Sequence, residues 1–87
     1  MEKKITIQNK LGLHARPAAL FVQTASRYKS AVKVLLGEQV ADGKSIMGLM
    51  MLAAGPGVEI CISATGPDEK EVIDSLESLI INKFAEE

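Results

Sequence analysis

Hydrophobic and polar residues alternate along four segments of the chain, and this alternation is typical of half-buried strands. In the segment from Lys4 to Gln8, Ile5 and Ile7 share one face, while Thr6 and Gln8 share the other. Successive side chains of a strand point to opposite faces of its sheet, so each strand should bury one face. The predicted strands are 4–8, 32–34, 40–41 and 58–64, and the last places Cys61 on its polar face.

A three- and four-residue spacing of apolar side chains predicts a helix from Ala15 to Tyr28. Arg27 lies near its C-terminal end, where the helix dipole favours a positive charge. Pro17 is tolerated only in the first turn of a helix, because it has no N–H to donate. The helix should therefore begin at Ala15 or Arg16, immediately after His14. Its apolar face comprises Ala18, Phe21, Val22 and Ala25.

Two further helices are expected. A short apolar helix from Ile46 to Leu52 follows Ser45, a residue type that favours the N-cap. The last helix follows a Gly-Pro-Asp turn, and Asp68 with Glu71 resembles a capping box. The order strand, helix, strand, strand, helix, strand, helix, with two-faced strands, predicts an α+β open-faced sandwich.

Composition is compatible with one domain over residues 1–87. The chain is 47% hydrophobic and 24% charged with a net charge of −1, which excludes general disorder and gives no sign of a nucleic-acid or membrane-surface partner. The longest apolar run, 46–54, is too short to span a bilayer. With no signal-peptide h-region at the start and one cysteine, Cys61, the chain is expected to be cytoplasmic.

The supply of reactive side chains is small. The chain has one histidine, His14, and no Cys/His cluster, so neither a metal nor a cofactor is expected. A domain of this size also has little interior for an enclosed pocket, which ordinarily needs ~300 Å³ or more. A surface site that acts on other macromolecules is therefore expected.

His14-Ala15-Arg16-Pro17 is the strongest candidate for such a site. The first amides of a helix lack intrahelical acceptors and carry partial positive charge, which suits a phosphate group. Arg16 adds a planar donor set for phosphate oxygens, and neutral imidazole is a nucleophile. His14 could thus take up a phosphoryl group and hold it. The structural alternative is a loop histidine that caps the helix, with Arg16 solvated beside it.

The segment Gly43-Lys44-Ser45 offers a second candidate. Ser45 should be an N-cap, and a phosphate there would be favourably placed at the helix start. A P-loop is excluded because Glu38 occupies the position of its first glycine. In the helix that follows, Leu49 and Leu52 should join the core. Met47 and Met50 remain as candidates for a surface that docks partners.

Three segments of the chain resemble a known family, the histidine-containing phosphocarriers HPr of the bacterial phosphoenolpyruvate-dependent phosphotransferase system. They are Leu11-Gly12-Leu13-His14-Ala15-Arg16-Pro17-Ala18, Gly43-Lys44-Ser45-Ile46-Met47-Gly48 and residues 60–66. The resemblance covers nearly the whole chain. It implies a four-stranded antiparallel sheet with three helices on one face, in the order βαββαβα, in a cytoplasmic monomer.

The resemblance also implies functions for individual residues. His14 would accept a phosphoryl group at Nδ1 from phosphorylated Enzyme I and pass it to Enzyme II A domains in sugar uptake, with Arg16 supporting the phosphate. The chain would be a phosphoryl carrier rather than a turnover enzyme. Ser45 would be the target of an ATP-dependent serine kinase, after which the protein binds a transcriptional regulator. Ile46, Met47 and Met50 would dock partners.

The chain departs from the family pattern in two respects. Pro56 replaces the lysine that many members have there, and segments 9–12, 64–67 and 84–87 look more like the nitrogen-related branch, NPr. Two functions therefore stay open. One is a phosphorelay carrier, and the other is a regulatory binding protein, either NPr-like or a co-repressor switched at Ser45. Regulatory relatives lack the histidine, whereas this chain has His14.

Overall fold

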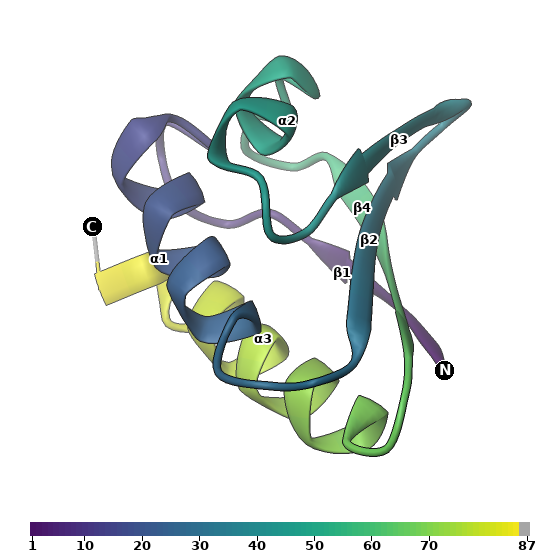
Figure 1. The fold of residues 1–87 in the computed structure, drawn as a ribbon. Helices are drawn as coiled ribbons and strands as arrows, with labels where there is room; N and C mark the ends of the chain where they lie inside the picture. The colour runs from purple at the N-terminus through teal and green to yellow at the C-terminus, as the bar shows by residue number, and fades with distance from the viewer. Residues whose placement is uncertain (86–87) are drawn as a thin grey trace.

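The computed structural model describes residues 1–85, and these residues form one antiparallel sheet with helices on one of its faces (Figure 1). The strands run in the spatial order β1-β4-β2-β3, and the predicted α+β open-faced sandwich is confirmed. Residues 86 and 87, part of the predicted domain and of its NPr-like end, lie outside the described residues. The elements are β1 Glu2–Thr6, α1 Ala15–Ala25, β2 Ala31–Leu36, β3 Gln39–Asp42, α2 Ile46–Met51, β4 Glu59–Thr65, α3 Glu69–Ile81 and the 3-10 segment η1 Lys83–Ala85.

The alternation along the strands determines which face of the sheet is covered. Ile5 of β1 lies opposite Ile60 of β4, and Ile62 of β4 lies opposite Val34 of β2, so apolar residues from neighbouring strands align on the helix side. The other face stays open and carries the half-exposed Cys61, as predicted. The buried hydrophobic residues are Ile5, Ile7, Leu13, Ala18, Phe21, Ala25, Val32, Val34, Ala41, Leu49, Leu52, Ala54, Ile60, Ile62, Ala64, Val72, Ile73, Leu76, Ile80 and Phe84.

Helix α1 ends at Ala25, three residues earlier than the periodicity predicts. The N–H groups of Arg27 and Tyr28 donate to carbonyl groups only three residues back, which is the geometry of a tightening turn. The Tyr28 hydroxyl shares a hydrogen bond with Ser75 of α3, and the ring packs against the core. Anchoring Tyr28 to α3 turns the chain toward β2. Arg27 therefore lies beyond the helix rather than in its last turn.

The predicted capping box at the start of α3 is wrong. Asp68 occupies the N-cap, but its side chain makes no cap hydrogen bond. Its carboxylate instead accepts hydrogen bonds of 2.9 Å from the N–H groups of Lys29 and Ser30, and a further one from the Ser30 hydroxyl. The Asp68 N–H donates back to that hydroxyl at 3.3 Å. Asp68 thus joins the start of α3 to the entry of β2, a partner that no local pattern reveals.

These hydrogen bonds make stability depend on pH. The Ser30 hydroxyl, followed by the Lys29 amide, holds the pKa of Asp68 below its ordinary value of 3.8. A carboxyl whose pKa is lowered in the folded state contributes stability above its ordinary pKa and loses that contribution as pH falls through the lowered value.

We predict that Asp68→Asn reduces the acid-induced loss of stability below pH ~4, measured by urea unfolding at successive pH values. Ser30→Ala should act in the same direction. An unchanged pH dependence in both variants would contradict this explanation.

Candidate functional site

His14 occupies the N-cap position of α1 and is partly exposed. Its backbone is extended (φ −83°, ψ −171°), and its carbonyl accepts the Ala18 N–H at 2.9 Å, which closes the first turn. The imidazole makes no cap hydrogen bond to the helix. The structural alternative of a capping histidine therefore describes the position of His14 in the backbone but not a role of its side chain.

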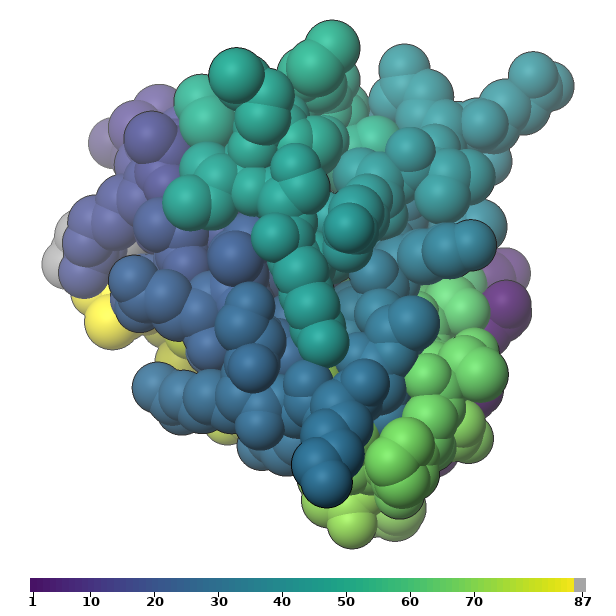
Figure 2. Space-filling view, viewed as in Figure 1, coloured from purple at the N-terminus to yellow at the C-terminus, as the bar shows by residue number. Residues whose placement is uncertain are grey.

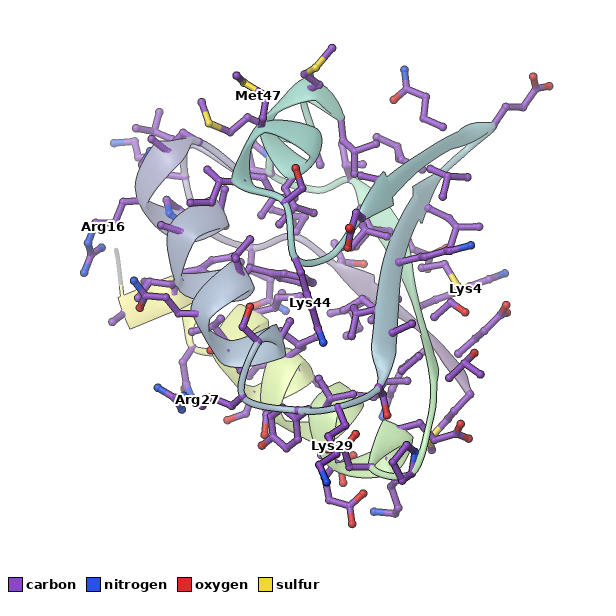
Figure 3. All side chains as sticks on the ribbon, in the orientation of Figure 1. Lys4, Arg16, Arg27, Lys29, Lys44 and Met47 are labelled. Atoms are coloured by element: carbon purple, nitrogen blue, oxygen red, sulfur yellow. The ribbon has the colours of Figure 1, made fainter. Side chains whose placement is uncertain are left out.

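Two residues of the first turn of α1 offer no backbone N–H group to a ligand. Pro17 has no N–H, and the Ala18 N–H donates to the His14 carbonyl. The amides that can point toward a group on His14 are those of Ala15 and Arg16. The Arg16 side chain is exposed and extends away from the ribbon at this end of the helix (Figure 3). His14, Ala15 and Arg16, the consecutive residues of the predicted site, therefore lie together at the start of α1.

The loop before α1 is held by a buried asparagine. The Asn9 side-chain Nδ2 donates to the Gly12 carbonyl at 2.7 Å, and the Gly12 N–H donates to the Asn9 carbonyl at 3.1 Å. Asn9 is fully buried. The two hydrogen bonds close a tight turn directly before the two residues that lead into α1. The sequence pattern places Asn9 just after the predicted strand 4–8, in segment 9–12, but a buried polar turn residue leaves no periodic signal that would reveal these hydrogen bonds.

Ser45 is the N-cap of α2, as predicted. Its hydroxyl accepts the Gly48 N–H at 3.0 Å, and its own N–H donates to the Asp42 carbonyl at 3.0 Å. Such a cap contributes about 1 kcal/mol. Two hydrogen bonds hold the neighbouring Lys44. Its backbone N–H donates to the Asp42 carboxylate, and its side-chain Nζ donates to the Tyr28 carbonyl. Ser45 therefore begins α2 on a well-anchored turn.

Helix α2 divides its apolar side chains as predicted. Leu49 and Leu52 are buried, whereas the other large apolar side chains of the helix are exposed. Met51 is 76% exposed and Met47 70%, and Met47 lies on the outer side of α2 (Figure 3). The space-filling view shows α2 forming the upper rim of the molecule (Figure 2). We call Ile46, Met47, Met50 and Met51 the methionine surface.

Met51 and Leu11 are exposed apolar residues that sequence analysis did not single out. Met51 lies four residues after Met47, so helical spacing alone could have placed it on the same face. Leu11 is 70% exposed in the loop before His14, where no periodicity applies. Met51 adds apolar area to the methionine surface.

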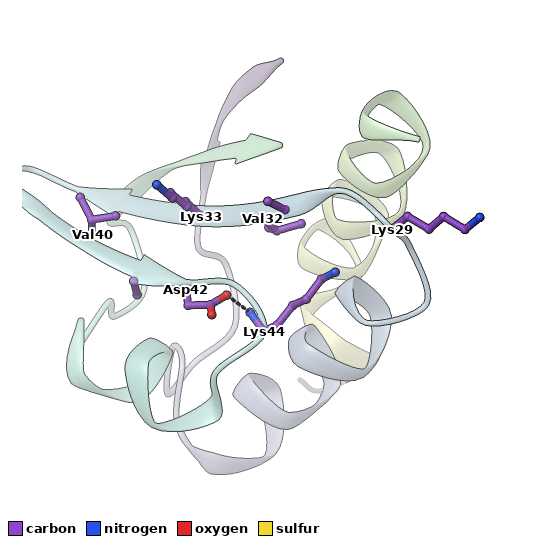
Figure 4. Close-up of a pocket in the computed structure, with 8 residues that line it drawn as sticks. Lys29, Val32, Lys33, Val40, Asp42 and Lys44 are labelled. Carbon is purple, nitrogen blue, oxygen red and sulfur yellow. Dashed lines mark hydrogen bonds between the residues drawn. The ribbon is translucent and has the colours of Figure 1, made fainter. Parts of the chain in front are cut away.

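The structure contains a surface hollow that size arguments did not predict. It has a volume of about 480 Å³ and lies between β2, β3 and the chain that joins β3 to α2 (Figure 4). Lys44 reaches across it, whereas Lys29 points away. Neither His14 nor Arg16 lines the hollow. The hollow is therefore not the site that the histidine motif defines.

Residues 1–85 show neither a membrane-spanning helix nor a metal-binding cluster. No helix in this part of the chain is both long and apolar enough to cross a membrane. Within the same residues, no group of three or more His, Cys, Asp or Glu side chains is arranged to hold a metal ion.

The fold and the site define a class of small α+β proteins whose one imidazole lies at the surface, at the start of a helix, rather than inside a pocket. A family model described as the PTS HPr component phosphorylation site matches residues 1–82. The chain belongs to the HPr family, the phosphocarrier proteins of the phosphotransferase system.

Individual relatives agree with this assignment. The chain is 48% identical to the phosphocarrier protein HPr of Cupriavidus necator, over 99% of this chain and 97% of the relative. It superposes on a crystal structure of HPr-C-His from Thermoanaerobacter tengcongensis with a TM-score of 0.96 at 50% identity, covering 100% and 98% of the two chains. It also resembles Crh, a catabolite repression protein of Bacillus subtilis solved as a domain-swapped dimer. That match has a TM-score of 0.78 at 42% identity and covers 93% of each chain.

Proposed function

We propose that the chain carries a phosphoryl group on His14, which it accepts from phosphorylated Enzyme I and passes to Enzyme II A domains in sugar uptake. The observation that carries this proposal is a partly exposed imidazole at the N-cap of α1, directly before Arg16. Membership of the HPr family supports the same function. In this account residues 1–87 form one carrier domain that works as a monomer in the cytoplasm.

The chemistry requires little beyond position and charge. A lone pair on a ring nitrogen of His14 forms the new N–P bond while the bond from phosphorus to the donor breaks, so the imidazole is a transient acceptor. The Ala15 and Arg16 amides and the Arg16 guanidinium offer N–H donors to the phosphoryl oxygens. No enclosed pocket is needed, because the partner protein covers the group during transfer. The chain is accordingly a carrier and not a turnover enzyme.

The methionine surface supplies a docking area for these partners. Ile46, Met47 and Met50 are exposed as docking residues should be, and Met51 extends the surface. Unbranched, polarizable methionine side chains adapt to different partner surfaces. A carrier that serves both a donor and several acceptors needs such a surface. We therefore propose that donor and acceptor proteins contact it in turn.

Transfer from Enzyme I and phosphoenolpyruvate should label the wild-type protein with acid-labile phosphate on His14. His14→Ala should gain none, since the chain has no other histidine. Mass spectrometry under alkaline conditions, which preserve a phosphoramidate, measures the label. Either an unlabelled wild-type protein or a labelled His14→Ala variant would refute the carrier function.

Arg16→Ala should slow transfer to His14 about tenfold or more, because a charge-assisted hydrogen bond to phosphate contributes about 1.5–3 kcal/mol. The unfolding midpoint should change little, since Arg16 is exposed. Arg27→Ala is the matched control: it removes the same charge from an exposed site beyond the other end of α1 and should transfer at the wild-type rate. Equal transfer rates for Arg16→Ala and Arg27→Ala would show that Arg16 does not support the phosphate.

A second candidate function is regulation through Ser45, which the similarity to Crh favours. Ser45 caps α2 directly before the methionine surface. A phosphate on its oxygen would place about two negative charges at the helix start, where they are electrostatically tolerated, and next to the area that docks partners. The modified protein would then lose its Enzyme I partner and bind a transcriptional regulator.

Incubation with ATP and an HPr-type serine kinase should label wild type but not Ser45→Ala, and Ser63→Ala on the open sheet face should be labelled normally. The phosphorylated protein should then accept phosphate on His14 more slowly. Peptide mapping identifies the modified residue, and the absence of label on Ser45 would eliminate this second function. Labelling of Ser45 without labelling of His14 would favour regulation as the main function.

A further inference from the structure

The loop that carries His14 makes a very close contact with the chain that leaves α2. The Leu13 N–H donates a hydrogen bond of 3.0 Å to the carbonyl of Ala54, and both residues are buried. Gly12 lies against the same carbonyl: a Cβ at this position would be 2.2 Å from the Ala54 oxygen. Gly12 also has φ +68°, a conformation that L side chains rarely adopt. Both the backbone conformation and the contact require glycine.

On the other side of this contact, the chain is held in a conformation that alanine seldom adopts. Ala53 has φ +55°, in the left-handed region. Its N–H donates to the Met50 carbonyl at 3.1 Å, and its neighbours Leu52 and Ala54 are buried, whereas Ala53 itself is exposed. The left-handed residue thus reverses the chain after α2 between two fixed side chains, which directs the Ala54 carbonyl at the loop before His14.

We propose that the Ala54 carbonyl, approached by Gly12 and oriented by Ala53, positions the imidazole of His14 for transfer. The inference rests on the carrier function proposed above and names the groups that position its reacting residue. Leu13 is the residue directly before His14, so the Leu13–Ala54 hydrogen bond fixes one end of the extended His14 backbone. Helix α1 fixes the other end through the His14–Ala18 hydrogen bond. A shift of Leu13 would move the imidazole while the buried face of α1 stays in place.

Gly12→Ala tests the contact, and Gly37→Ala is its matched control. Gly37 also has a positive φ, of +60°, but nothing lies within 4 Å of a Cβ there. Both substitutions therefore strain the backbone, and only Gly12→Ala pushes the loop away from Ala54. Gly12→Ala should lower the single-turnover rate of transfer at saturating Enzyme I about tenfold or more, since a misplacement of about 1 Å can cost on the order of 10²-fold. Gly37→Ala should transfer at the wild-type rate.

Because Gly12→Ala could unfold the loop, a second pair of variants changes the exposed Ala53 instead. Ala53→Val places a β-branched side chain where φ is positive, which is strongly disfavoured, whereas Ala53→Gly accepts the same conformation. Hydrogen exchange of the Leu13 amide reports the bond to Ala54 without any need for transfer. Ala53→Val should speed this exchange and slow transfer, each about tenfold or more, and Ala53→Gly should keep both near wild type.

Wild-type transfer by folded Gly12→Ala, or unchanged Leu13 exchange and transfer in Ala53→Val, would overturn the positioning role while leaving the carrier function intact. If wild type itself accepts no phosphate from Enzyme I, the carrier function fails. The positioning role in transfer fails with it, and Leu13 exchange in the Ala53 pair then decides only whether the anchor exists. Faster exchange with an unchanged single-turnover rate would show an anchor without influence on the imidazole, which also overturns the proposal.

Discussion

The restriction that proline places on a helix determines where the only histidine of this chain lies. Pro17 fits only in the first turn, which restricts the start of α1 to the residues just before it, and the helix begins at Ala15 with His14 at the N-cap. A residue there has a backbone outside the helix and a side chain beside the first amides. Pro17 is also buried, so the same residue anchors this end of the helix to the core. The imidazole of His14 is thus placed by a covalent constraint together with packing, and not by a pocket.

The division between core and surface explains how a small domain can have this chemistry. Leu49 and Leu52 hold α2 in the core, which leaves the methionine surface exposed. The chain then passes through Ala53 to Ala54, whose carbonyl accepts the Leu13 amide beside His14. Helix α2 and the imidazole are therefore joined by a short, well-packed path through buried residues. In the proposed function, protein partners would supply the phosphoryl group, exclude water and so complete the site.

Much of this arrangement could be predicted from local patterns, and the remainder depends on contacts distant in the sequence. Alternation at Ile5 and Ile7 and the position of Pro17 predicted a strand and the start of a helix. The strand was displaced by two residues, since β1 spans Glu2–Thr6 rather than 4–8 and Ile7 lies just beyond it. The end of α1 was not predictable, because Tyr28 bonds Ser75, 47 residues away. The capping box failed for the same reason, since Asp68 bonds Ser30 across 38 residues. The close approach of Gly12 to Ala54 is a contact between two backbone segments, and hydrophobic periodicity gives no signal for it.

The most direct measurement of the central claim is phosphorus–nitrogen correlated NMR of ¹⁵N-labelled protein after incubation with Enzyme I and phosphoenolpyruvate. It identifies the atom that carries phosphorus without relying on a variant. We expect one phosphorus signal coupled to a ring nitrogen of His14, with Nδ1 as the expected position, and unchanged amide shifts across the sheet. Phosphorus attached to any other residue, or no attached phosphorus in the folded protein, would contradict it.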